Sequence, residues 1–166
     1  LNILNAICQV YLTVIRGTPM MVQLMIMYFV IFASSRHSVA VATLAFGINS
    51  GAYVAEIVRG GIMSVDAGQM EAGRSLGMNY TQTMRHIIIP QAIKNILPAL
   101  GNEMITLLKD TSLMTVTGAK DLMKAAQSVT AVTYQPLMPY VSIAVIYLVC
   151  VMALSKALAV FERRLR

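Results

Sequence analysis

The sequence has few charged residues. Only 12% of its 166 residues are Asp, Glu, Lys or Arg, against about 25% in ordinary soluble domains, and 57% are hydrophobic. This balance excludes a typical water-soluble domain and indicates a chain that folds in lipid. The formal charge of +6 does not indicate nucleic-acid binding, because the basic residues are scattered between apolar runs and cluster only at Arg163, Arg164 and Arg166.

Residue patterns for catalysis and metal binding are also lacking. The two cysteines, Cys8 and Cys150, lie far apart in apolar runs and match no metal or redox spacing, so we expect them to be packing residues. The sequence contains no H-E-x-x-H or G-x-S-x-G, which argues against an intramembrane enzyme. No signal peptide is legible, and the chain opens at Leu1 inside a hydrophobic pattern, so we expect a fragment that lacks its natural N-terminus.

Four apolar segments approach the ~20 residues that cross a hydrocarbon core. The first combines 3–15 with 20–33, and we expect it to be interrupted or kinked near Gly17-Thr18-Pro19, because proline lacks a backbone donor. The others run from about 39 to 58, 93 to 117 and 139 to 161. Internal repeats and linkers are absent, so the prediction is one domain over 1–166, an all-α polytopic transmembrane helical bundle.

The positions of Lys and Arg predict the orientation. Basic residues flank the polar stretch around 66–90 and close the last span, so both places should be cytoplasmic. Segments 34–38 and 120–135 should then lie outside. Arg36, Lys120 and Lys124 oppose this assignment, but they are outnumbered by Arg59, Arg74, Arg85, Lys94, Lys156, Arg163, Arg164 and Arg166.

The polar stretch has its own helix signals. Asp66 with Gln69 resembles a capping box, Gly77 is placed to end the helix, and Asn79 with Gln82 repeats the start signal. We therefore expect two short helices, about 67–76 and 80–89. The second should have an apolar face that packs on protein (Tyr80, Met84, Ile87, Ile88) and a polar face for water or a partner (Gln82, Arg85, His86). The alternative is a helical connection that only joins two spans.

The same stretch resembles a known signature. Glu71-Ala72-Gly73, Gly77, Ile87 and Pro90 are similar to the EAA motif, E-A-A-x3-G-x9-I-x-L-P, of the membrane subunits of bacterial ABC importers. Gly73 replaces the second Ala and Ile89 replaces the Leu, and both changes keep the kind of side chain. The segments 16–19 with Gln23, 52–62, 75–78, 90–92, 97–103 and 161–165 resemble the polar amino acid uptake branch, of histidine, glutamine and arginine type.

The resemblance implies a MetI-like type I importer permease fold of five helices, the first missing here, in the bacterial cytoplasmic (inner) membrane. It implies three kinds of partner: ABC ATP-binding subunits, an extracytoplasmic amino-acid-binding protein, and a second permease in a homo- or heterodimer. ATP and Mg would belong to the ATP-binding subunits, and this chain would bind no cofactor and would not be an enzyme. The coupling helices, about 64–92, would contact the ATPase through Glu71, Ala72, Gly73, Arg74, Gly77, Ile87 and Pro90. For Glu71 and Arg74, a pair with each other is the alternative.

Charges in the third span suggest a substrate pathway, because a lone charge at the bilayer centre costs at least about 2.5–3.5 kcal/mol. A free amino acid carries an ammonium and a carboxylate, which Glu103 and Lys109 could bind. The neighbouring candidates are Asn49, Ser50, Asp110 and Ser112. The alternative is an internal ion pair that joins helices.

Two other charged groups are expected to be structural. Glu56 and Arg59 should form an i, i+3 pair, and Arg16 should reach the inner membrane interface. For the whole chain, the alternative function is an ion-gradient-driven secondary transporter or channel subunit, which would have no reason to carry such a capped helix pair.

Overall fold

The computed structural model describes residues 2–35 and 37–165. Arg36 and Arg166, and the side chain of Arg164, which entered the orientation argument, lie outside the described part. All elements of the described ranges are helical, which confirms the predicted all-α class. They are α1 (Asn2–Gly17), α2 (Met20–Ile26), the π-helical turn η1 (Met27–Ile31), α3 (Ser38–Met63), α4 (Ala67–Ser75), α5 (Tyr80–Thr83), the π-helical turn η2 (Met84–Ile88), α6 (Ile89–Asp110), the 3-10 segment η3 (Thr111–Thr117), α7 (Leu122–Thr133) and α8 (Leu137–Leu165).

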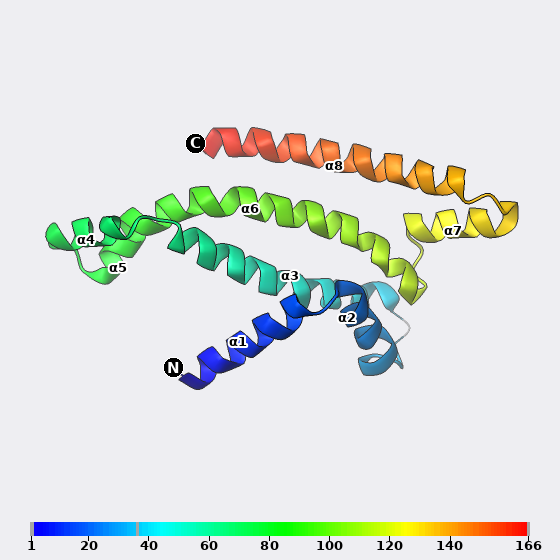
Figure 1. The fold of residues 1–166 in the computed structure, drawn as a ribbon, viewed down its shortest axis with the longest axis horizontal. Helices are drawn as coiled ribbons and strands as arrows, with labels where there is room; N and C mark the ends of the chain where they lie inside the picture. The colour runs from blue at the N-terminus through cyan, green and yellow to red at the C-terminus, as the bar shows by residue number, and fades with distance from the viewer. Residues whose placement is uncertain (1, 36, 166) are drawn as a thin grey trace.

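Three long helices form the body of the molecule. In Figure 1, α6 runs between α3 and α8, and it packs against both. Helices α4 and α5 lie at one end, toward which both chain termini also point, whereas α7 and the turn before α3 lie at the other end (Figure 1). This arrangement agrees with the predicted orientation, because it separates the stretches expected inside from those expected outside.

The first predicted span is broken more sharply than a kink. Helix α1 ends at Gly17, Pro19 has an extended backbone (φ −64°, ψ 136°), and the α2–η1 piece leaves at 108° to α1. The break lies where the sequence predicted it, but the two pieces do not form one straight rod. By length and composition, α3 and α8 can each cross a membrane, and the bent pair is a third crossing if it counts as one span.

The third predicted span differs from expectation in its extent. Helix α6 begins at Ile89 and ends at Asp110, and residues 111–117 form the 3-10 segment η3 rather than the end of the helix. Helix α6 is not among the helices that are apolar enough by composition to cross a membrane on their own, and it carries four charged residues: Lys94, Glu103, Lys109 and Asp110. Its position between α3 and α8 removes much of it from the lipid.

Glycines set the closest approaches between these helices. A Cβ at Gly61 would overlap the Ile96 side chain, so the backbone of α3 at Gly61 lies directly against the Ile96 side chain of α6. At Gly101 a Cβ would lie 3.3 Å from Leu158 Cδ1, which brings α6 near α8. Small residues at such crossings are typical of helices that pack within a membrane.

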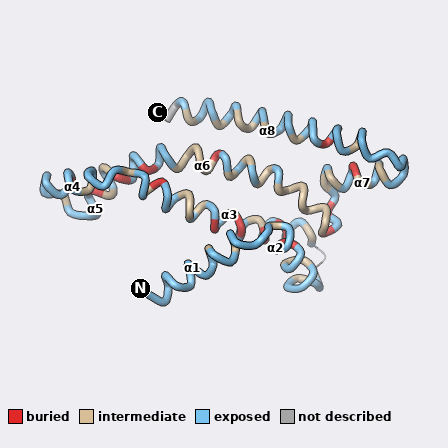
Figure 2. The backbone as a smooth tube through the Cα atoms, in the orientation of Figure 1, coloured by how far each residue is buried: buried red, intermediate tan, exposed pale blue. Residues whose placement is uncertain are grey.

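Few side chains are buried within this single chain. A small core joins α2 to α3 around Leu24, Ala42 and Ala45. Figure 2 shows that buried residues follow the helix contacts, whereas most of α1 and α8 is exposed. Cys8 and Cys150 are exposed on these two helices, so the prediction that they are packing residues inside the chain is wrong.

Candidate functional site

Helix α4 begins at a side-chain cap and ends at a glycine turn. The Asp66 carboxylate accepts a hydrogen bond from the Gly68 N–H at 2.6 Å, but the side chain of Gln69 does not return to Asp66 and instead accepts one from Gln91 at 3.4 Å. Asp66 is therefore a simple N-cap, and the predicted capping box is wrong, because the Gln69 side chain lies toward the next helix.

The turn after α4 is a Schellman motif centred on Gly77. The Met78 N–H donates to the Gly73 carbonyl at 3.1 Å, and the Gly77 N–H donates to the Arg74 carbonyl at 2.9 Å. Gly77 has φ +80°, a left-handed conformation that favours glycine. The sequence prediction that this glycine ends the helix is confirmed.

Helix α5 starts with a complete capping box. The Asn79 side chain accepts from the Gln82 N–H, and the Gln82 side chain accepts from the Asn79 N–H, both at 2.9 Å. This confirms the second predicted start signal. The reciprocal pair fixes the direction in which the chain leaves the Gly77 turn.

The second helix of the pair does not end near residue 89 as predicted. Helical structure is continuous from Tyr80 through η2 into α6 and on to Asp110. Pro90 cannot donate to the carbonyl of His86, and its ring crowds that carbonyl, so the turn widens into a π-helical one in which the Ile89 N–H donates to Met84. The coupling helix and the third span are therefore one helical run.

Helix α4 packs on this run through Gly73 and Thr83. Thr83 is fully buried, and its hydroxyl donates to the Asn79 carbonyl at 3.1 Å. Ile88 is also buried, and Met84 and Ile87 are half-buried. Tyr80, which was predicted for this face, is 61% exposed at the start of α5, and the buried Thr83 takes the central position instead.

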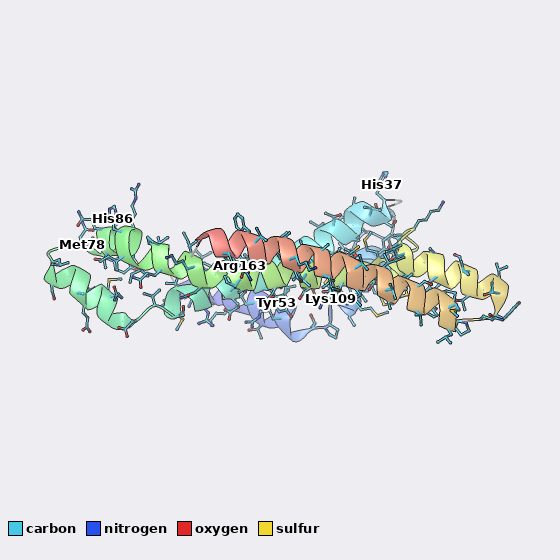
Figure 3. The ribbon with its side chains drawn as sticks, turned by 90° about the horizontal axis from the view of Figure 1, so that it is seen from above. His37, Tyr53, Met78, His86, Lys109 and Arg163 are labelled. Carbon is cyan, nitrogen blue, oxygen red and sulfur yellow. The ribbon has the colours of Figure 1, made fainter. Side chains whose placement is uncertain are left out.

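The opposite side of α4 is exposed. Glu71, Ala72 and Arg74 are exposed, and the ion pairs in the described ranges do not include one between Glu71 and Arg74. This surface lies at one extremity of the molecule, next to the labelled Met78 and His86 (Figure 3). A rigid, capped helix thus presents two unpaired charges and a small residue to whatever lies beyond it.

A polar cavity lies about halfway along the molecule. It measures about 480 Å³ and lies where the α1–α2 break meets α3 and α6. Its lining includes the predicted pathway residues Asn49, Glu103 and Asp110, and Ser50 reaches it through a hydrogen bond to Glu103 at 3.0 Å. Lys109 and Ser112 are not among the residues that line it.

The cation of this cavity is Arg16 rather than Lys109. Arg16 forms an ion pair with Glu56 at 2.9 Å and lies over the Tyr53 ring at 5.8 Å from its centre, so its guanidinium has partners within the chain, and its place at the inner membrane interface stays a prediction. Glu56 also pairs with Arg59 at 2.8 Å, which confirms the local i, i+3 pair. The contact of Arg16 with Glu56 joins residues far apart in the sequence, so no local spacing could have revealed it.

Gln23 fixes the break at the cavity rim. Pro19 leaves the Ile15 carbonyl without its usual helical donor, and the Gln23 amide donates to that carbonyl at 2.7 Å and to the Thr18 hydroxyl at 2.7 Å. The Gln23 oxygen accepts from the buried Asn49 side chain at 3.0 Å. A glutamine four residues after the proline was the available sequence signal for this network.

Residues 2–166 match the family model described as binding-protein-dependent transport system inner membrane component. The chain is 41% identical over 170 residues to the glutamine transport system permease protein GlnP of Escherichia coli K12, covering 99% of this chain and 77% of that protein. It is also 41% identical over 163 residues to the arginine transport system permease protein ArtQ of Bacillus subtilis, covering 96% and 74%.

A solved structure shows the same fold. The crystal structure of an amino acid ABC transporter with histidines is 50% identical in sequence and superposes with a TM-score of 0.86, over 94% of this chain and 74% of the solved one. At this identity the likeness extends beyond the arrangement of helices to the sequence itself.

Proposed function

Since this chain belongs to the family of binding-protein-dependent transport system inner membrane components, we propose that it moves a polar amino acid into the cell as one permease of a pair. It is the membrane-spanning subunit of an ABC amino-acid importer, as its relatives are. ABC ATP-binding subunits, which hold ATP and Mg, supply the energy, and an extracytoplasmic binding protein delivers the amino acid. The membrane is the bacterial cytoplasmic membrane.

The observation that carries the coupling proposal is the unbroken helical run from Tyr80 to Asp110. Helix α4 is locked to this run at Gly73 and Thr83, and the run reaches Glu103 about 30 Å away at 1.5 Å per residue. A displacement of α4 by a partner on its exposed face is therefore transmitted to the cavity along continuous helix, with no flexible loop in between. Glu71, Ala72 and Arg74 are the residues that meet the ATP-binding subunit.

The polar cavity is the proposed place where the amino acid is held in the membrane. Its volume falls within the ~300–1,000 Å³ of small-molecule sites. Arg16 can bind the α-carboxylate, and Glu103 can accept from the α-ammonium, with Asn49 adding a neutral hydrogen bond. Two carboxylates, Glu103 and Asp110, face one guanidinium, so the cavity favours an amino acid with a basic side chain, such as arginine or histidine, over glutamine.

Substrate binding to the purified permease with its ATP-binding subunits, without the binding protein, tests this assignment. Equilibrium dialysis with labelled arginine, histidine and glutamine should show the strongest binding for the basic amino acids. Glu103→Gln should weaken that binding by about 10- to 100-fold, because hydrogen bonds to charged groups contribute about 1.5–3 kcal/mol. Glu162→Gln, a carboxylate of α8 that is not in the cavity lining, is the matched control.

The possible results test the assigned binding site and the importer function independently of each other. Equal binding by wild type and Glu103→Gln contradicts the assigned site. ATP-dependent uptake of an amino acid by wild type in proteoliposomes would still support an importer in that case. A gradient-driven carrier would instead show uptake that stops when the ion gradient is removed and that does not depend on ATP.

A further inference from the structure

Helix α1 has two faces that the cavity described above does not explain. Polar residues recur along one face at helical spacing: Asn5, Gln9, Thr13 and Arg16. Large apolar residues occupy the opposite face and are all more than half exposed: Ile3, Ile7, Val10 and Val14. Such a helix fits a place between lipid on one side and water or a polar partner on the other.

The polar face of α1 lines a second cavity. This cavity measures about 600 Å³, and its lining includes the polar residues Asn5, Gln9, Thr13 and Arg16 of α1, the less polar Cys8 and Leu12 of the same helix, and Glu56 and Arg59 of α3. The hydrogen bonds found among the described residues include none from the side chains of Asn5, Gln9 or Thr13. In a chain that folds in lipid, polar groups without partners are unfavourable unless water or a ligand reaches them.

The two cavities adjoin each other. Arg16 and Gly17 line both of them. From Arg16, α1 runs toward the end of the molecule that carries α4 and α5, so the second cavity lies on the side of the ATP-binding subunits (Figure 1). Between the two cavities stands a charge cluster in which the Glu56 carboxylate binds both Arg16, at 2.9 Å, and Arg59, at 2.8 Å.

We propose that the polar face of α1, with Glu56 and Arg59, forms a water-filled exit chamber through which the amino acid leaves the central cavity toward the cytoplasm. The proposal rests on the function proposed above. The Arg16–Glu56 pair closes the passage, and the carboxylate of the amino acid competes with Glu56, first for Arg16 and then for Arg59. No covalent step is involved. The chamber therefore takes a zwitterionic amino acid, whatever its side chain.

Thiol accessibility tests the chamber in the assembled transporter. In a background without native thiols (Cys8→Ser, Cys150→Ser), Gln9→Cys is compared with Val10→Cys, which lies on the apolar face. Inverted membrane vesicles are treated with a membrane-impermeant, positively charged methanethiosulfonate. Gln9→Cys should react at least about tenfold faster, because a thiol in apolar surroundings keeps a raised pKa and little thiolate. Thr13→Cys provides a second position if Gln9→Cys does not assemble.

Excess arginine or histidine, added without the binding protein, should slow the modification of Gln9→Cys severalfold. Fast modification with this protection supports the chamber. Equal rates at the two positions, or fast modification that neither amino acid slows, overturns it. Oxidative cross-linking of Gln9→Cys to a second permease also overturns it, because the polar face would then be a contact between permeases. ATP-dependent uptake of an amino acid by the wild-type transporter, in proteoliposomes supplied with the binding protein, tests the proposed function separately.

Discussion

The contact between Gly73 and Thr83 gives the sharpest quantitative prediction. Gly73 stands where the EAA signature has alanine, so Gly73→Ala restores the signature and would be expected to be harmless. The structure predicts the opposite. A Cβ at residue 73 would lie 2.6 Å from Thr83 Cγ2 and 2.8 Å from Thr83 Oγ1. Thr83 is fully buried and its hydroxyl is bonded to the Asn79 carbonyl, so it has little freedom to move.

The magnitude follows from two opposing effects. Replacing glycine by alanine inside a helix stabilises by about 0.5–1 kcal/mol. Overpacking a buried contact destabilises by about 1–3 kcal/mol. Gly73→Ala should therefore reduce stability by up to about 2.5 kcal/mol when residue 83 is Thr. In a Thr83→Ala background the clash is largely removed, since the nearest remaining Thr83 atom, Cβ, would lie 3.2 Å from the new Cβ, and the same substitution should become neutral or stabilising.

The assay is a double-mutant cycle on the detergent-purified transporter, followed by thermal unfolding and by substrate-stimulated ATPase activity. A change of 1 kcal/mol should shift Tm by about 2–4 °C in a protein of this size. Thr83→Ala alone should also lower Tm, because it removes a buried side chain and its hydrogen bond. If the effects of Gly73→Ala and Thr83→Ala on stability add to within about 0.5 kcal/mol, as for independent sites, then the two side chains do not clash.

Three further predictions concern the same helices. Because Gly77 has φ +80°, Gly77→Val should destabilise the protein by at least about 1–2 kcal/mol and uncouple ATP hydrolysis from uptake, and Gly77→Asn should have a milder effect. The control is Gly118→Val, which should strain the backbone equally, at φ +76°, but leave the ratio of ATP hydrolysed to amino acid imported unchanged. Asn79→Ala should lower stability by about 1 kcal/mol, measured as Tm, whereas equal Tm values would contradict a role for the capping box. Gly61→Ala should push α3 away from α6, because the new Cβ would overlap Ile96, and it should reduce stability by about 1–3 kcal/mol, seen as a lower Tm. An unchanged Tm would contradict the close packing.

Local signals in the sequence predicted local structure well. Gly77 ends α4, the Asn79 box starts α5, and the chain breaks at Gly17-Thr18-Pro19, because each feature depends on residues within one turn of one another. Asp66 shows the limit of such reasoning. Its spacing to Gln69 matches a capping box, but the glutamine side chain lies toward Gln91, a tertiary contact.

Features that depend on packing were not predictable from spacing. The second short helix was predicted to end near residue 89, but the chain continues through the π-helical turn in which the Ile89 N–H donates to the Met84 carbonyl, so helical structure runs on into α6. The sequence predicted Lys109 as the cation that works with Glu103, because both charges lie in the third predicted span and match the two charged groups of a free amino acid. Arg16 takes that position in the cavity because the sharp break after α1 brings its end to α3, which no periodicity encodes. Helix α7 was predicted only as a connection.

The proposed function requires ATP-binding subunits to drive this permease through the exposed face of α4. ATP-driven uptake of a labelled amino acid in proteoliposomes that contain the permease, its ATP-binding subunits and the binding protein tests this most directly. Ala72→Trp places a bulky ring on that face without disturbing the packing side, and Ala157→Trp does the same on the exposed surface of α8. Ala72→Trp should abolish uptake, whereas Ala157→Trp should retain it. Full uptake by Ala72→Trp would show that the exposed face of α4 is not where the ATP-binding subunits act.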